Sequence, residues 1–165
     1  VEHEGTYRLP EAQLDRFLFK IDVPYPTLEE EVRILESHHR SDLDGQIATV
    51  AKVIDAANII ALQAAIRHIH AEEKLIRYIA EVVGATRTAR SVFLGASPRA
   101  SVSALIAAKS IAAMQGRDFV TPDDILFVLK PVLRHRIVLT PEKEMEGLSP
   151  DEVIDQIVQG IEIPR

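Results

Sequence analysis

Apolar residues recur three and four positions apart along most of this chain, with polar residues between them. That spacing places apolar side chains on one face of an α-helix. One further segment is rich in alanine, a strong helix former whose small side chain lets helices pack closely. The helices predicted in this way are about 28–38, 56–68, 72–86, 98–115, 121–132 and 150–159. The pattern indicates a mainly α fold, in which the helices at 56–68 and 72–86 face a core.

Several of these helices begin at a recognisable capping sequence. Thr27-Leu28-Glu29-Glu30 and Ser149-Pro150-Asp151-Glu152 are capping boxes, in which the first and fourth residues exchange hydrogen bonds between side chain and backbone. Ser97-Pro98 and Thr121-Pro122 each place a capping hydroxyl before a proline, which suits the first position of a helix. Gly116 suits the left-handed position after a helix end. These local signals mark where the helices begin and end.

Residues 17–23 depart from the helical pattern. They follow a short helical turn that begins at Pro10, are rich in aromatic and β-branched residues, and stop at Pro24-Tyr25-Pro26. We therefore expect one strand here. A lone strand leaves backbone groups unpaired, so we expect the rest of its sheet to lie outside this sequence. Without that sheet, the strand would fold back on the helices of this chain, pair with another copy or remain disordered, and the last two outcomes are slightly favoured.

Three other places interrupt the helices. Residues 41–45 are a predicted loop, and residues 47–54 are expected to be extended or only loosely ordered. Pro131 lies within the helix predicted at 121–132, where it should kink or shorten the helix because it lacks a backbone N–H.

Composition narrows the class of protein. A chain of 165 residues that is 47% hydrophobic and 27% charged can form one core, or one domain and part of a neighbouring one. It has no cysteine, no apolar run near the roughly 20 residues of a membrane span, and no signal sequence, so we expect a cytoplasmic protein without a membrane partner. The formal net charge of −6 disfavours nucleic acid as the main partner.

The residues do not support a metal site, a nucleophilic active site or a phosphate-binding loop. The pairs His38-His39 and His68 with His70 lack the spacing that brings two ligands onto one helix face, so no metal site is expected. No Gly-x-Ser-x-Gly elbow and no Gly-x-x-x-x-Gly-Lys-Ser/Thr phosphate loop occurs. The paired carboxylates lie in first helical turns, where the helix dipole explains them.

Two arginines remain as candidates. Arg16 ends the short helical turn beside the predicted strand, and Arg99 lies in the first turn of the alanine-rich helix. A cation there does not help the helix dipole, so Arg99 indicates an anionic partner, for which phosphate is the natural choice. Pairing with a nearby carboxylate and an unpaired surface position are the alternatives. Guanidinium groups at both places suit bidentate contact with phosphate oxygens.

An ordered set of short motifs gives a more specific indication, and together they resemble the C-terminal half of MoxR-type AAA+ ATPases. The resemblance extends over nearly the whole chain, and the order of the motifs makes it specific. The motifs are Gly5-Thr6-Tyr7, Leu9-Pro10-Glu11-Ala12-Gln13-Leu14-Asp15-Arg16-Phe17, Tyr25-Pro26, Thr86-Arg87, Gly95-Ala96-Ser97-Pro98-Arg99-Ala100, Gly116-Arg117-Asp118-Phe119-Val120-Thr121-Pro122-Asp123-Asp124 and His135-Arg136.

The resemblance implies a multi-helix lid bundle at residues 24–165, preceded at 1–23 by a remnant of the α/β ATPase core: a helical turn and one strand. Arg16 would be the arginine finger, which acts on ATP bound by the neighbouring subunit. Arg99 would be the second sensor of nucleotide, in its own or the adjacent subunit. The parent protein would bind ATP and Mg²⁺, form a homo-oligomeric ring, and remodel or chaperone other proteins, with von Willebrand factor A domain proteins among its partners.

The same resemblance implies that the Walker A lysine, the Walker B acid and the first sensor would precede Val1. We therefore expect this chain alone neither to bind ATP tightly nor to hydrolyse it. A rival interpretation is a free-standing helical interaction module in which Arg16 and Arg99 are structural. Residues 116–130 also resemble histone-type folds, a DNA-associated class against which the acidic balance weighs.

Overall fold

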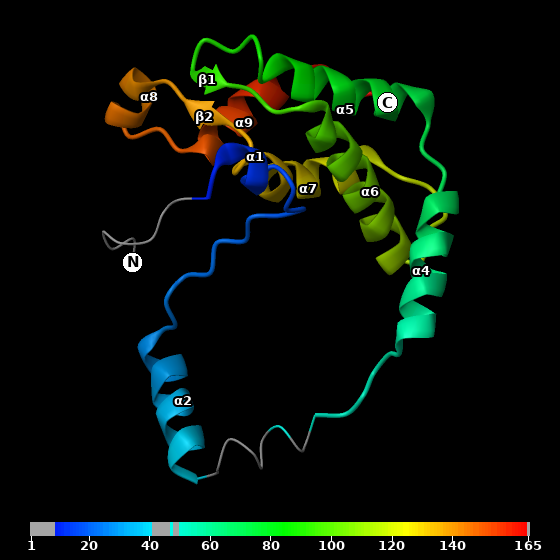
Figure 1. The fold of residues 1–165 in the computed structure, drawn as a ribbon, viewed down its shortest axis with the longest axis vertical. Coiled ribbons are helices and arrows are strands. Elements are labelled where there is room, and N and C mark those ends of the chain that lie inside the picture. Colours follow the sequence, from blue (N-terminus) through cyan, green and yellow to red (C-terminus); the bar gives the residue numbers. More distant parts are fainter. Residues whose placement is uncertain (1–8, 41–46, 48–49, 165) are drawn as a thin grey trace. The chain divides into compact units, whose positions relative to one another are not determined.

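The computed structural model describes residues 9–40, 47 and 50–164, and most of them are helical, which confirms the mainly α fold (Figure 1). The chain divides into two compact units, Val1–Lys20 with Ala64–Arg165, and Ile21–Gln63. The division into 1–23 and 24–165 stays a prediction. The elements are α1 (Glu11–Leu14), α2 (Leu28–Arg40), α4 (Ala56–His68), α5 (Glu73–Ala85), β1 (Val92–Leu94), α6 (Pro98–Met114), α7 (Pro122–Leu133), β2 (Val138–Leu139), α8 (Pro141–Met145) and α9 (Pro150–Gln159).

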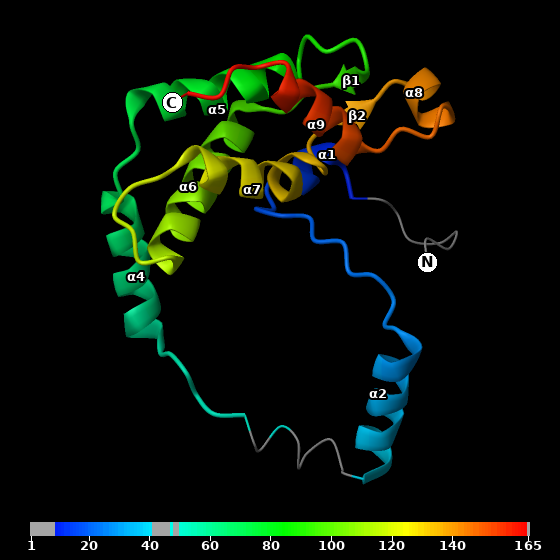
Figure 2. The ribbon, with the colours of Figure 1, turned by 180° about the vertical axis from the view of Figure 1, so that it is seen from behind.

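The core of the larger unit lies among α5, α6, α7 and α9. The alanine-rich α6 packs chiefly against α7 and also against α5, and α9 packs on both α5 and α7 (Figures 1 and 2). The buried face of α6 is almost entirely alanine, which lets the neighbouring backbones approach closely. The buried apolar residues of these helices are Leu75, Tyr78, Ile79, Val82, Val83, Ala100, Ala104, Ala107, Ala108, Ala112, Ile125, Val128, Leu129, Val132, Leu133, Val153 and Ile154.

The caps expected from the sequence form in this unit. Glu152 and Ser149 exchange hydrogen bonds at the start of α9, and the Asp124 carboxylate accepts from the Thr121 backbone N–H at the start of α7, 2.8 Å away. Gly116 has φ of 73° after α6, the left-handed value that its position predicts. Although Pro131 lies inside α7, the helix continues to Leu133.

Three elements, β1, β2 and α8, were absent from the predicted set. A two-stranded antiparallel sheet pairs Val92 with Leu139 and Leu94 with Val138, with an irregular register between them. The short helix α8 follows directly. Strands of three and two residues are too short to show an alternating pattern, so only their pairing across the fold reveals them.

The strand predicted at 17–23 is wrong. All seven residues lie in the described part of the chain, and none of them is in a strand. Within the larger unit, the backbone N–H of Lys20 donates to the carbonyl of Pro131, 2.9 Å away, in place of a ladder. A strand requires a paired edge. Phe17, Ile21 and Val23 accordingly remain exposed.

The smaller unit contains α2 and the first residues of α4. Thr27 and Glu30 form the expected capping box at α2, with the Thr27 N–H 2.8 Å from the Glu30 carboxylate. Residues 50–55 form neither helix nor strand, and the loop predicted at 41–45 lies outside the described residues. The prediction that 56–68 faces a core is wrong, since α4 has no buried residue. Its apolar side chains point in several directions rather than along one face.

Candidate functional site

Arg99 lies where the sequence places it, at the start of α6. The Ser97 hydroxyl caps this helix and accepts from the Arg99 backbone N–H at 3.3 Å. The guanidinium turns to Asp15, with Nη1 3.0 Å from Oδ2, and 53% of the Arg99 side chain stays exposed. The anion beside Arg99 in this chain is therefore a carboxylate, one of the alternatives to phosphate.

Asp15 connects three parts of the larger unit. Its carboxylate accepts from the Ser97 hydroxyl at 3.0 and 3.1 Å, from Arg99, and from Nε of Arg136 at 3.1 Å. Ser97 and Arg99 begin α6, whereas Arg136 follows the end of α7. The residue after Asp15 is Arg16. One carboxylate thus holds the segment that bears Arg16 against two helix ends.

Arg136 is the residue of this site that sequence reasoning missed. Its side chain is only 1% exposed, and it donates to the carboxylate and backbone carbonyl of Asp15 and to the carbonyls of Phe17 and Leu18. Burial lowers the pKa of its guanidinium, and the hydrogen bond that it donates to Asp15 opposes this effect. His135-Arg136 was part of the family resemblance, yet the partners of Arg136 in residues 15–18 lie more than a hundred positions away, beyond any local spacing rule.

Arg16 contrasts with both other arginines. Its side chain is exposed and makes no hydrogen bond or ion pair with any other residue in 9–40, 47 or 50–164. Asp15 links Arg16 and Arg99, the two residues predicted from the sequence, because it precedes the first in the chain and pairs with the second.

Two residues of another predicted motif, Thr86 and Arg87, hold the loop before α6 in place by hydrogen bonds. Thr86 is fully buried; its hydroxyl donates to the Val83 carbonyl at 2.6 Å and accepts from the Ala96 N–H at 3.0 Å. Nε of Arg87 donates to the Ala96 carbonyl at 2.8 Å. At Gly95, a Cβ would lie 2.7 Å from the Arg87 Cα, so only glycine fits this close approach. The motifs Thr86-Arg87 and Gly95–Arg99 form one structural unit.

A cavity of about 290 Å³ lies beside these residues. His135 lines it and contacts the Phe17 carbonyl through Nε2 at 3.0 Å, which requires the proton on Nε2. Burial lowers the pKa of His135; the contact with Phe17 opposes this effect, and the charge of Arg136 adds to it. The cavity is lined by Glu11, Ala12, Asp15, Leu94, Gly95, Ser97, His135, Arg136 and Val138.

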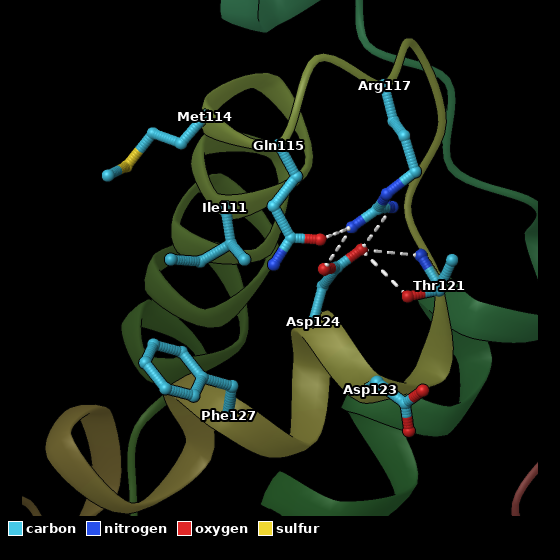
Figure 3. A pocket seen from close by; sticks show the side chains of 8 residues that line it. All are labelled: Ile111, Met114, Gln115, Arg117, Thr121, Asp123, Asp124 and Phe127. Atoms are coloured by element: carbon cyan, nitrogen blue, oxygen red, sulfur yellow. Dashed lines mark hydrogen bonds and ion pairs between the residues drawn. The ribbon is translucent and has the colours of Figure 1, made fainter.

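A second, wider cavity of about 770 Å³ lies at the turn between α6 and α7 (Figure 3). Its polar floor is a bidentate pair, in which Arg117 contacts both oxygens of Asp124 at 2.6 and 2.8 Å. Burial raises the pKa of Asp124, but hydrogen bonds from Arg117 and Thr121 outweigh it, so the pKa is lowered. Exposed Met114 and Phe127 form its apolar side. The paired charges fix the turn and leave little charge for a ligand.

Two absences hold for the residues that the structure describes. Between residues 9 and 164, apart from 41–46 and 48–49, no three His, Asp or Glu side chains cluster so that they could hold a metal ion. Over the same ranges, no helix combines the length and apolar character needed to cross a membrane.

Comparison with known proteins gives consistent results. Residues 84–157 match the AAA lid domain family. The chain is 39% identical over 174 residues to chaperone MoxR1 of Mycobacterium tuberculosis, covering 100% of this chain and 45% of that protein. It is 32% identical over 182 residues to protein MoxR of Paracoccus denitrificans, covering 99% of this chain and 53% of that protein.

A solved structure agrees with these sequence relatives. The crystal structure of a candidate ATPase from Cytophaga hutchinsonii superposes with a TM-score of 0.89 at 35% identity, covering 100% of this chain and 52% of that one. The chain therefore spans about half the length of the proteins it matches. The resemblance to MoxR-type AAA+ proteins is confirmed.

Proposed function

Because the chain resembles MoxR-type AAA+ proteins along its whole length, we propose that it is the lid and arginine-finger portion of such an ATPase. The parent protein couples ATP hydrolysis to the remodelling or chaperoning of partner proteins in the cytoplasm, von Willebrand factor A domain proteins among them. Residues 1–23 belong to its ATPase core and 24–165 to its lid. The observation that carries the proposal is the carboxylate of Asp15, which joins the segment of Arg16 to that of Arg99.

Arg16 is the catalytic residue in this proposal. An arginine finger must project from its subunit and keep its charge free until it meets the neighbour's nucleotide. The exposed Arg16 side chain, without a partner in the described parts of the chain, fits that requirement. The role requires a ring of subunits, so that Arg16 stabilises charge on the phosphoryl group held with Mg²⁺ next door.

Arg99 is the nucleotide sensor in this proposal, in its own or the adjacent subunit. The Arg99 side of its ion pair with Asp15 is half exposed, and ion pairs that reach solvent contribute at most about 1 kcal/mol. A phosphate, which carries more charge and more acceptor oxygens, competes well for the same guanidinium. Exchange of Asp15 for phosphate would then separate the Asp15 carboxylate from Arg99, while Ser97 and Arg136 still donate to it.

The test compares three arginine variants of the full-length protein in a steady-state ATPase assay. Arg16→Ala should lower kcat about 1,000-fold with little change in KM, because a finger acts on the transition state. Arg99→Ala should raise KM for ATP. Arg77→Ala, which removes an exposed arginine of α5, is the matched control and should keep parental rates. Parental turnover by the Arg16 variant would refute the finger assignment.

A second test uses the 165-residue chain itself. It has no Gly-x-x-x-x-Gly-Lys-Ser/Thr loop to hold the phosphates, so we expect no tight ATP binding and no hydrolysis. Calorimetric titration with Mg-ATP measures this directly. Tight binding would mean that the nucleotide site is contained in this chain, contrary to the proposal.

A further inference from the structure

The backbone around Arg16 is held from one side by a single guanidinium. Residues 15–18 follow α1 as a turn and a bend, outside any helix or strand. Arg136 donates to the carbonyls of Asp15, Phe17 and Leu18 at 3.1, 2.6 and 3.2 Å, and Nε binds the Asp15 carboxylate. The carbonyls both before and after Arg16 are therefore fixed to one side chain.

The same guanidinium nitrogens also donate to the helical bundle. It donates to the Val132 carbonyl in the last turn of α7 and to the Ser103 hydroxyl of α6, 3.3 Å away. Arginine can make this set of contacts because it has five N–H donors in a rigid plane, whereas lysine has a single ammonium group. Arg136 thus ties the turn that bears Arg16 to the rigid contact between α6 and α7.

We propose that Arg136 is a positioning residue for Arg16: it sets the place of the finger on the lid while touching no nucleotide itself. The proposal rests on the finger role of Arg16 given above. The proposal also gives different roles to Arg99 and Arg136, the two arginines that bind Asp15. Arg99 is half exposed and can exchange its partner, whereas Arg136 is only 1% exposed and keeps the turn in place when Arg99 leaves.

The clamp is tested first on the 165-residue chain by hydrogen exchange. The N–H groups of Arg16, Phe17 and Lys20 donate to backbone carbonyls and serve as probes. Arg136→Lys should speed their exchange at least 10-fold and leave α5 and α9 unchanged. Arg99→Ala should leave the three probes near parental rates, and so should Arg134→Lys, which alters a neighbouring arginine paired with Asp151. Unchanged exchange in Arg136→Lys would overturn the proposal.

Should Arg136→Lys fail to fold, which its burial makes a risk, Asp15→Asn provides the second variant. It removes the carboxylate and keeps the carbonyl contacts of Arg136, so the probes should exchange faster than in the parent and faster than in Arg99→Ala. Asp15→Asn alters the contact of residue 15 with Arg136, whereas Arg99→Ala leaves that contact intact. Equal exchange rates in the two variants would therefore contradict the clamp.

The link to catalysis is tested in the full-length protein by a double-mutant cycle on kcat. A finger displaced by about 1 Å loses on the order of 100-fold in rate, so Arg136→Lys should lower kcat by 10- to 100-fold with KM unchanged. In an Arg16→Ala background, Arg136→Lys should cause no further loss, since there is no finger to position. A further loss of the same size would overturn the positioning role. Parental kcat in Arg16→Ala alone would instead refute the finger assignment.

Discussion

The close approach at Gly95 gives the sharpest test of how the site is built. In Gly95→Ala, the new Cβ would lie 2.7 Å from the Arg87 Cα and 2.8 Å from its N, whereas ordinary contacts begin at 3.4 Å. The two backbones must therefore separate by about 0.7 Å, the difference between 3.4 and 2.7 Å. A shift of that size would lengthen both hydrogen bonds to Ala96, now 3.0 and 2.8 Å, beyond their useful range.

The expected cost follows from these contacts. Each of the two lost hydrogen bonds contributes about 1 kcal/mol, and overpacking adds about 1 kcal/mol or more, so Gly95→Ala should lower the free energy of unfolding by about 3 kcal/mol. Gly84→Ala is the matched control. Gly84 lies within α5, and no atom beyond its own stretch of helix would lie within 4 Å of an added Cβ, so alanine should stabilise the chain by about 0.5 kcal/mol.

Urea unfolding followed by far-UV circular dichroism measures both variants against the parent. The two alanines should move the midpoint in opposite directions, because one meets a neighbouring backbone and the other meets open space. A loss below about 1 kcal/mol in Gly95→Ala would show that the loop relaxes freely. In that case, the bracing of Gly95 by Thr86 and Arg87 would not define the start of α6.

Three further predictions concern other contacts of the larger unit. Burial lowers the pKa of His135 in the folded chain, so protonation of His135 favours unfolding. The free energy of unfolding should therefore fall as the pH drops below 6.5, the ordinary pKa of histidine. His135→Gln, which can still donate to the Phe17 carbonyl, should show a shallower fall in unfolding curves between pH 7.5 and 5.5. Asp124→Asn leaves Arg117 without its charged partner and should lower the free energy of unfolding by about 2 to 3 kcal/mol, measured with urea. An unchanged free energy of unfolding would contradict this argument. Ser149→Ala removes the cap of α9 and should cost about 1 kcal/mol, which Ser149→Asn should largely restore in the same assay.

The sequence could predict those parts of the fold and of the site whose hydrogen bonds stay within one turn of chain. The Ser97 cap of α6 is such a contact, and so is the capping box of Ser149 with Glu152. Arg99 was identified as a cation aimed at an anion for the same reason, since its place in the first turn of a helix is a local fact. The choice of Asp15 as its partner was not local, because 84 positions separate the two residues.

The limits of local reasoning are clearest at residues 17–23. Their composition favours a strand, but a strand exists only when another edge pairs with it, and this segment is held by Arg136, by His135 and by one contact to α7 instead. Conversely, β1 and β2 are too short for any pattern to predict, and they form because their edges meet. Pairing is a property of the whole fold.

By itself, the sequence determined where most helices begin, that the chain is mainly α, and which family it resembles, because caps, apolar spacing and motif order are carried by neighbouring residues. Only the tertiary structure decided that Arg136 is buried against the turn of Arg16, that Asp15 is shared between two arginines, and that position 95 must be glycine. These contacts join distant parts of the chain, so they depend on how the helices pack.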